Sequence, residues 1–306
     1  MIERKEYQGT TWVDICQPKY GEIEDLIKEF ELDPFTVTEL TNQSLKQKVE
    51  LHSNAIFIVL YVPTFKNRGG SKETVVQEID FLIGNGFIIT IRHDHIDAIV
   101  RAKKILEVNS ALNKNHFENE TLFVFFEIFK EIYNSLTNEV EDINMAINEI
   151  SKEMFSGKEK QMVYSISYVT RTLLEFKKTI ITHKEILTLL ERAGKSHFGS
   201  FFTDYISAIR AEYGKIEHSL AISKEVITNF HFTNTSLVNT KQNEIMLMLT
   251  SVTFLLLPLS FIVSLFFLDT VSRVLPPPPY DLWVLLGTLG AVALFLGSVF
   301  KYKGWL

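Results

Sequence analysis

Cysteine is nearly absent from this chain of 306 residues, because Cys16 is the only one. A single cysteine excludes an intrachain disulfide and any cluster of thiolate ligands around a metal, so zinc fingers are excluded as well. The lack of disulfides fits a protein that works in a reducing compartment.

An excess of positive charge is also lacking. The formal net charge is -6 at pH 7, which argues against nucleic-acid partners and mildly favours cations. The sequence starts with MIERKEYQGT, where charges fill the place of the apolar core that a signal peptide needs. We therefore expect the N-terminal part to remain in the cytoplasm.

Residues 1–117 lack the motifs of common enzymes: a Gly-rich phosphate loop, a nucleophile elbow and a metalloprotease motif. No enzymatic activity is therefore expected. Short β-rich stretches occur instead, at TTWVDIC, KVELH, AIFIVLYV, TVVQEIDFLIG and GFIITIRH. Helical patterns lie between them at EIEDLIKEF and HIDAIVRAKKILEVN, and Gly84-Asn85-Gly86 is expected to close a hairpin. Residues 1–117 are thus predicted to form a cytoplasmic α/β domain.

A coiled-coil helical hairpin is predicted over residues 118–203. Its first helix, 118–155, carries apolar residues at alternating steps of four and three, from Leu122 to Met154. After a turn at Gly157, a second stripe with the same spacing runs from Met162 to Leu190. His183 falls on this stripe, where a hydrogen-bonded structural role is expected rather than a metal site.

Two long apolar runs occupy the C-terminal end. Residues 245–268 form an uncharged run of 24 residues, about 36 Å as a helix, which exceeds a hydrocarbon core of roughly 30 Å. Residues 282–300 are a second candidate span. Lysines precede the first run and follow the second, whereas the loop 269–281 carries two Asp and one Arg, so both termini should be cytoplasmic. A buried hairpin of a soluble protein is the alternative, although such long uncharged runs are rare in soluble cores.

The first span should continue a stalk helix, 204–244, and carry one polar face. Steps of three and four from Asn243 reach every Ser and Thr of the run except Ser251. The stripe consists of Asn243, Met246, Thr250, Thr253, Leu257, Ser260 and Ser264. The neutral oxygen atoms of this stripe suit the passage of hydrated Mg²⁺. In an oligomer, Met246 and Leu257 would form narrow apolar rings that could act as gates. The alternative is that the Ser and Thr residues mediate helix packing in the membrane. Since two spans cannot enclose a pore, a channel would require a symmetric ring of subunits.

Four stretches in this order resemble the CorA family of magnesium and divalent cation transporters. They are WVDI (12–15), FELDPFTVTELTNQSLKQKVELHSNAIFIVLYV (30–62), NEIMLMLTSVTFLLLPLSFI (243–262) and FKYKGWL (300–306). The resemblance covers nearly the whole chain. It implies a homopentamer in the inner (plasma) membrane, with the first span lining a pore for divalent cations, most simply Mg²⁺.

The resemblance also implies roles for particular residues. Asn243, Met246, Leu249, Leu257 and Ser260 match positions that line or gate the pore in the family. Family members hold regulatory Mg²⁺ between neighbouring cytoplasmic domains, and the matching acids here are Glu39, in VTEL, and Asp204, in FFTDY. Thr38 stands where the family often has a second acid. The alternative is that both acids are solvated surface charges.

The chain departs from the family at the outer mouth. The family's Gly-Met-Asn is replaced by Phe267, Leu268 and Asp269, so neither the close approach of glycine nor the neutral amide is available. Five copies of Asp269 would attract cations but release them slowly, unless Asp269 merely ends the helix in bulk water. Relatives that transport zinc are also grouped with this fold, so the transported ion need not be Mg²⁺. A non-conducting metal sensor or modulator, and a membrane-anchored enzyme or scaffold, remain as alternatives.

Overall fold

The structure is a computed structural model that describes residues 2–7, 9–33, 36–68, 71–111, 119–266 and 280–302. The chain divides into two units, Met1–His231 and Phe232–Leu306. Each unit is described separately. The helix α7, Phe202–Phe266, belongs to both units, since the division falls within it.

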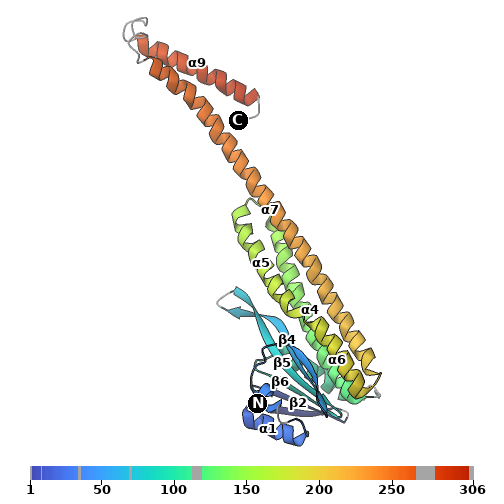
Figure 1. The fold of residues 1–306 in the computed structure, drawn as a ribbon. Helices are drawn as coiled ribbons and strands as arrows, with labels where there is room; N and C mark the ends of the chain where they lie inside the picture. Colours follow the sequence, from blue (N-terminus) through green and yellow to red (C-terminus); the bar gives the residue numbers. More distant parts are fainter. Residues whose placement is uncertain are drawn as a thin grey trace. The chain divides into compact units, whose positions relative to one another are not determined.

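A six-stranded mixed sheet organises the first unit (Figure 1). Its strands are β1 (Ile2–Tyr7), β2 (Thr10–Cys16), β3 (Lys48–Leu51), β4 (Ala55–Arg68), β5 (Ser71–Gly84) and β6 (Phe87–Arg92). The spatial order is β1-β2-β6-β5-β4-β3, in which only β2 and β6 pair in parallel among the described strands. The predicted hairpin at residues 84–86 is confirmed, with Gly86 at φ +82° in its turn.

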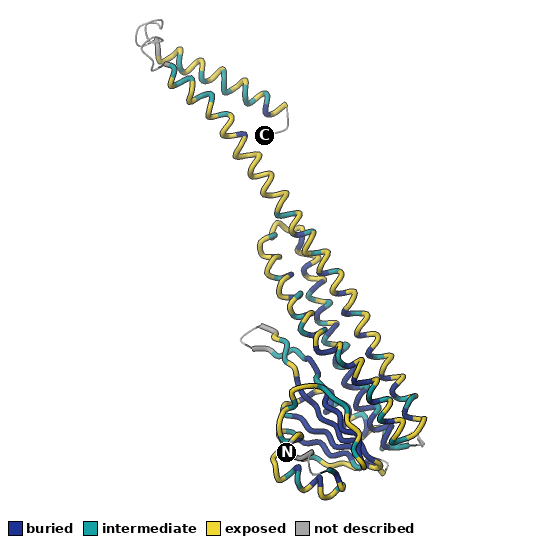
Figure 2. The backbone as a smooth tube through the Cα atoms, in the orientation of Figure 1, coloured by how far each residue is buried: buried dark blue, intermediate teal, exposed yellow. Residues whose placement is uncertain are grey.

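One face of the sheet is covered by α1 (Tyr20–Glu29) and α2 (Thr36–Thr41). Three apolar residues of α1, Ile23, Leu26 and Ile27, pack on the strands. The strand side of this core consists of Val13, Ile15, Ala55, Phe57, Val59, Leu82, Phe87, Ile89 and Ile91. Figure 2 shows this interior as a block of buried backbone. The α/β class predicted for residues 1–117 is therefore confirmed.

The opposite face carries α3 (Asp97–Ala111) and the start of α4 (Glu120–Glu153). The Asp14 carboxylate of the WVDI stretch is buried there. It accepts hydrogen bonds from Thr90 Oγ1 at 2.7 Å, Arg92 Nη2 at 3.1 Å and Lys103 Nζ at 2.6 Å. Burial opposes the charge of Asp14, but its bonds to Arg92 and Lys103 outweigh burial and lower the pKa of that carboxyl. The motif thus ties β2, β6 and α3 together.

Both predicted apolar stripes of the helical hairpin lie inside the unit. The members of the first apolar stripe, between Leu122 and Met154, are buried in and beside α4, with Phe126 only half-buried. The second stripe is divided between α5 (Glu159–Ile180) and α6 (His183–Phe198), rather than carried by one helix. The division occurs because Ile181 and Thr182 form a turn, directly before the anchored His183.

His183 has the structural role predicted for it. Its Nε2 lies 2.8 Å from the carbonyl oxygen of Tyr61 and its Nδ1 lies 3.1 Å from the Tyr133 hydroxyl. Since a carbonyl only accepts, Nε2 carries the proton and Nδ1 accepts from Tyr133. Burial lowers the pKa of His183 to about 4, so the ring is neutral at neutral pH.

Two acids are buried on the α1–α2 face of the sheet. Asp80 and Glu78 of β5 stand opposite Val59 and Tyr61 of β4, and Asp80 is 1% exposed. Glu78 accepts a hydrogen bond from the Ser44 amide at 2.8 Å, whereas Asp80 Oδ1 accepts none from the described residues. Burial, followed by the neighbouring Glu78 carboxyl, raises the pKa of Asp80 to about 9.

The second unit contains the apolar end of α7 together with α9 (Tyr280–Tyr302). Both helices are long and apolar enough to cross a membrane, and their apolar windows are 6% and 0% buried. Figure 2 shows them largely exposed. A buried soluble hairpin would show the opposite, so this alternative is disfavoured. The predicted spans 245–268 and 282–300 fall on these helices, except for residues 267–268, which lie outside the described residues.

A substitution in α6 tests the packing at the start of α7. A methyl group at Gly194 would overlap the ring of the fully buried Phe202. We expect Gly194→Ala to destabilise the protein by about 1–3 kcal/mol, as overpacking does. Gly214→Ala is the control, because Gly214 has nothing within 4 Å of the added methyl, and it should stabilise by about 0.5–1 kcal/mol. Thermal unfolding in detergent distinguishes them, and equal melting temperatures would contradict this packing.

A second substitution tests the buried proton on Asp80. Because its folded pKa of about 9 exceeds the ordinary 3.8, the folded state alone keeps this proton between those pH values. Stability should therefore fall as pH rises through that window, by up to about 1.4 kcal/mol per pH unit. His183 acts oppositely, raising stability from about pH 4 to 6.5.

The effect of Asp80 is consequently clearest between pH 6.5 and 9. Asp80→Asn mimics the protonated form, so we expect its melting temperature to decline less than that of the unmodified protein between pH 6.5 and 8.5. Parallel declines would show that Asp80 is ionised in the folded state.

Candidate functional site

The polar stripe occupies a single exposed face of α7. All of its predicted members are exposed, and Leu249 is exposed as well. The less exposed positions of this segment are Ser251, Leu255, Pro258, Leu259, Ile262, Val263 and Leu265. At about 100° per residue, the two sets are centred roughly 160° apart around the helix. The less exposed positions of α9 also gather on one side of their helix, at Leu285, Leu289, Val292, Ala293, Leu296, Gly297, Val299 and Phe300. The stripe thus lies on the face that is not used for intrachain packing.

The hydroxyl groups of the stripe are oriented by the helix itself. Thr253, Ser260 and Ser264 donate to the carbonyl oxygens of Leu249, Leu256 and Ser260, at 2.9, 2.9 and 3.0 Å. The single proton of each hydroxyl is therefore used within the helix. The oxygen lone pairs are left to face outward, so these side chains offer hydrogen-bond acceptors to their surroundings.

Glu39, the predicted regulatory acid of α2, is engaged within its own chain. Its Oε2 lies 2.7 Å from Lys48 Nζ, which also lies 3.1 Å from Glu50 Oε1. Partial burial opposes the charge of Lys48, but the hydrogen bonds to Glu39 and Glu50 outweigh it and raise the Lys48 pKa. The side chain of Thr38, beside Glu39, is outside the described residues.

Asp204, the other predicted acid, lies elsewhere in the unit. It is exposed in the first turn of α7 and lines a hollow of about 400 Å³ with Asn109 of α3 and Glu127 of α4. The start of α4 contacts β2 through Thr121 and Thr10, and the end of α3 contacts β1 through Glu107 and Lys5, whereas Glu39 contacts β3 at the other edge of the sheet. One chain therefore does not bring Glu39 and Asp204 together. Over the described ranges, no group of three or more His, Cys, Asp or Glu is arranged to hold a metal ion.

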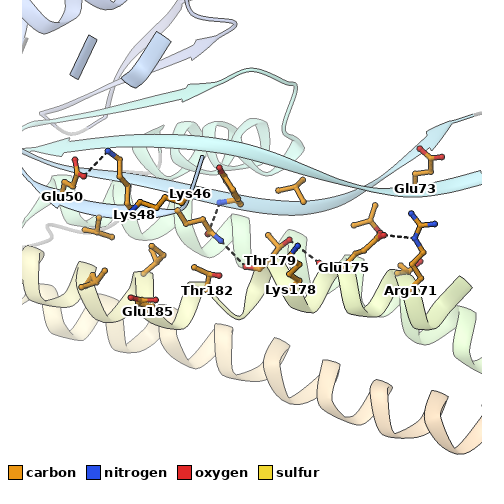
Figure 3. Close-up of a pocket in the computed structure, with 18 of the residues that line it drawn as sticks. Lys46, Lys48, Glu50, Glu73, Arg171, Glu175, Lys178, Thr179, Thr182 and Glu185 are labelled. Atoms are coloured by element: carbon orange, nitrogen blue, oxygen red, sulfur yellow. Dashed lines mark hydrogen bonds and ion pairs between the residues drawn. The ribbon is translucent and has the colours of Figure 1, made fainter. Parts of the chain in front are cut away.

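A large groove was not predicted from the sequence (Figure 3). This feature, here called the β3–α5 groove, has a volume of about 1240 Å³ and lies between β3 and β5 on one side and α5 and α6 on the other. Its basic residues are Lys46, Lys48, Arg171 and Lys178, and its acidic residues are Glu50, Glu73, Glu175 and Glu185. Ion pairs join Lys48 to Glu50 and Arg171 to Glu175. The balanced charges favour neither anionic nor cationic ligands.

No local signal in the sequence could have revealed this groove. Its walls come from segments around residues 46–50, 73–76 and 168–189, which only the packing of helix on sheet brings together. The predicted mouth residues Phe267, Leu268 and Asp269 lie outside the described residues, so their arrangement stays a prediction.

Comparison with known proteins gives consistent matches over nearly the whole chain. The Cobalt/magnesium transport protein CorA of Methanocaldococcus jannaschii is 22% identical, covering 96% of this chain and 91% of that protein. The protein of the same name from Thermotoga maritima is 21% identical, covering 97% and 83%. The complete structure of the CorA magnesium transporter from M. jannaschii superposes with a TM-score of 0.80 at 21% identity, covering 97% and 92%.

These likenesses confirm the predicted fold class: a mixed α/β domain, long helices and two apolar C-terminal helices. The family is one of transporters rather than enzymes, in agreement with the missing enzyme motifs. A model of the CorA-like Mg²⁺ transporter proteins matches residues 7–301, and the chain therefore belongs to the CorA-like family.

Proposed function

We propose that this chain is the subunit of a homopentameric membrane channel for divalent cations, with Mg²⁺ as its ion. The observation that carries the proposal is the stripe of hydroxyl and amide side chains on an otherwise apolar, exposed helix. Polar groups facing lipid would be unfavourable, so their exposed face calls for water or a polar partner. A ring of five copies would turn these stripes toward a shared axis. Family membership supports the same assembly.

The stripe supplies chemistry that suits a hydrated cation. Mg²⁺ loses water reluctantly, and the waters around it point their protons outward. The hydroxyls of Thr253, Ser260 and Ser264, whose own protons are bound within the helix, accept hydrogen bonds from those waters. Cations then pass without losing their hydration and without being held by fixed charges.

Apolar side chains interrupt the polar stripe and are proposed as gates. Met246, Leu249 and Leu257 are 67%, 67% and 66% exposed on the same face. In a narrow ring, such side chains exclude water and stop a hydrated ion until the helices move apart. At the outer end, Phe267 stands in place of the family's glycine and Asp269 in place of its asparagine. Both are proposed to slow the passage of cations. A flux assay also distinguishes this channel from a non-conducting metal sensor.

Regulation is proposed to use Glu39 of one subunit and Asp204 of the next. Because the two acids lie at opposite edges of the sheet, a ring of subunits can bring one edge against the other. A divalent cation between the two carboxylates would remove their mutual repulsion and join the cytoplasmic units.

The first test of the channel compares the two faces of α7. The combined change Thr253→Val and Ser260→Ala removes hydroxyls from the stripe, and Mg²⁺ flux into liposomes loaded with a divalent-ion dye should fall about tenfold. Ser251→Ala, on the packed face, is the matched control and should conduct as the unmodified protein does. If only Ser251→Ala reduced flux, the stripe would serve helix packing rather than conduction.

The regulatory site predicts stabilisation by metal. When Mg²⁺ is near a hundred times its dissociation constant, the assembled protein should gain about 2.7 kcal/mol over the protein in EDTA. The combined change Glu39→Gln and Asp204→Asn should abolish the rise in melting temperature, whereas Glu185→Gln, an exposed acid of the β3–α5 groove, should preserve it. A rise that survives the double change would place the metal elsewhere.

A further inference from the structure

The environment of Lys48 suggests how the proposed regulatory site is controlled. Its ammonium group lies between two carboxylates, those of Glu39 and Glu50, and 5.0 Å from the ring centroid of Phe57. The side chain is 17% exposed, whereas the side chains of Glu39 and Glu50 are 44% and 46% exposed. Lys48 is thus held in position, while Glu39 remains accessible to ions in solution.

Because Glu39 already has a cation beside it, a metal ion cannot bind there without a rearrangement. The ammonium group and a divalent ion would both approach the same carboxylate, and their like charges would repel each other. The ion pair is partly exposed and therefore weak. A divalent cation at moderate concentration can displace it, because two charges interact with the carboxylate more strongly than one.

The structure also provides other acceptors for a displaced Lys48. Glu50 lies two residues further along β3 and on the same side of the strand, so the pair at 3.1 Å can persist without Glu39. Figure 3 shows this pair at one end of the β3–α5 groove. Across the sheet, Lys48 and Asp80 both stand opposite Val59, so the buried Glu78–Asp80 acids share that face. Lys48 can leave Glu39 without becoming an uncompensated buried charge.

We propose that Lys48 is an internal cation that competes with the regulatory divalent ion for Glu39, and that it leaves Glu39 and keeps only its pair with Glu50 when metal binds. The inference rests on the proposed regulatory role of Glu39, and it adds what sets the metal concentration at which the regulatory site fills. Without metal, Lys48 is shared between Glu39 and Glu50 and therefore offsets only part of the repulsion between Glu39 and Asp204 of the next subunit. When metal binds, it displaces Lys48 from Glu39. The metal concentration at which this occurs depends on the strength of the Lys48–Glu39 ion pair.

The test is a Mg²⁺ titration of the full-length protein in detergent, followed by its melting temperature. Lys48→Gln removes the competitor, so the Mg²⁺ concentration for half of the effect should fall about three- to fivefold, as expected for a weak ion pair. Lys46→Gln is the control, because it removes the same charge from the same groove and should leave that concentration unchanged.

A second variant tests where Lys48 goes. Glu50→Gln removes the other acceptor, so Lys48 should hold Glu39 more firmly and the half-effect concentration should rise about twofold. In the presence of Lys48→Gln, the same Glu50→Gln change should have almost no effect, because the residue through which it acts is gone. This comparison separates displacement of Lys48 from a general loss of negative charge.

The outcomes distinguish the inference from the proposal beneath it. If Mg²⁺ produces no shift in melting temperature that depends on Glu39, both the proposed regulatory site and the proposed competition by Lys48 are wrong. If the shift depends on Glu39 but is unaffected by Lys48→Gln and Glu50→Gln, the site stands and Lys48 is only a structural partner. Equal effects of Lys46→Gln and Lys48→Gln would likewise overturn the inference, since they would show general electrostatics.

Discussion

The hydrogen bonds of His183 connect the helical hairpin to the sheet, and much of the first unit depends on them. Through Nε2 the ring holds the backbone of Tyr61 in β4, and through Nδ1 it holds Tyr133 in α4. The Tyr61 amide also donates a hydrogen bond to Gln47 Oε1, and Gln47 Nε2 in turn donates to the carbonyl oxygen of Thr179 in α5. The segment that leads into β3 is therefore positioned by the hairpin. Lys48 directly follows Gln47 in the sequence, so these contacts also fix the backbone position of Lys48.

The sequence predicts those features that depend on the spacing of residues along one element. The apolar stripe between Leu122 and Met154 is buried, apart from the half-buried Phe126, because a helical period places its members on one side of α4. The stripe from Asn243 to Ser264 is visible for the same reason. The sequence does not predict β1 or α2, because IERKEY is dominated by charges and TVTELT is only six residues long. Such short elements form because neighbouring parts of the fold complete them.

Contacts between elements lie beyond such reasoning. The alternation in VVQEIDFLIG would direct Glu78 and Asp80 to solvent, opposite to Ile79 and Phe81. In the structure both sides of β5 are covered, and the two acids are enclosed. The pairing of Glu39 with Lys48 is equally invisible, since nothing in VTEL or KVEL specifies that α2 lies over β3. A charged residue at a predicted site can therefore already have a partner, and this changes what a ligand must displace.

The back-bonded hydroxyls of α7 have a consequence for the sign of the charge that a channel built from them would accept. Water around an anion points its protons inward and its oxygen atoms outward, so a passing hydrated anion needs donors along its path. Thr253, Ser260 and Ser264 have already used their only protons on backbone carbonyls. The part of the wall that these three residues form would disfavour chloride through the polarity of its hydrogen bonds, and none of the three is a carboxylate that could trap the cations that it admits.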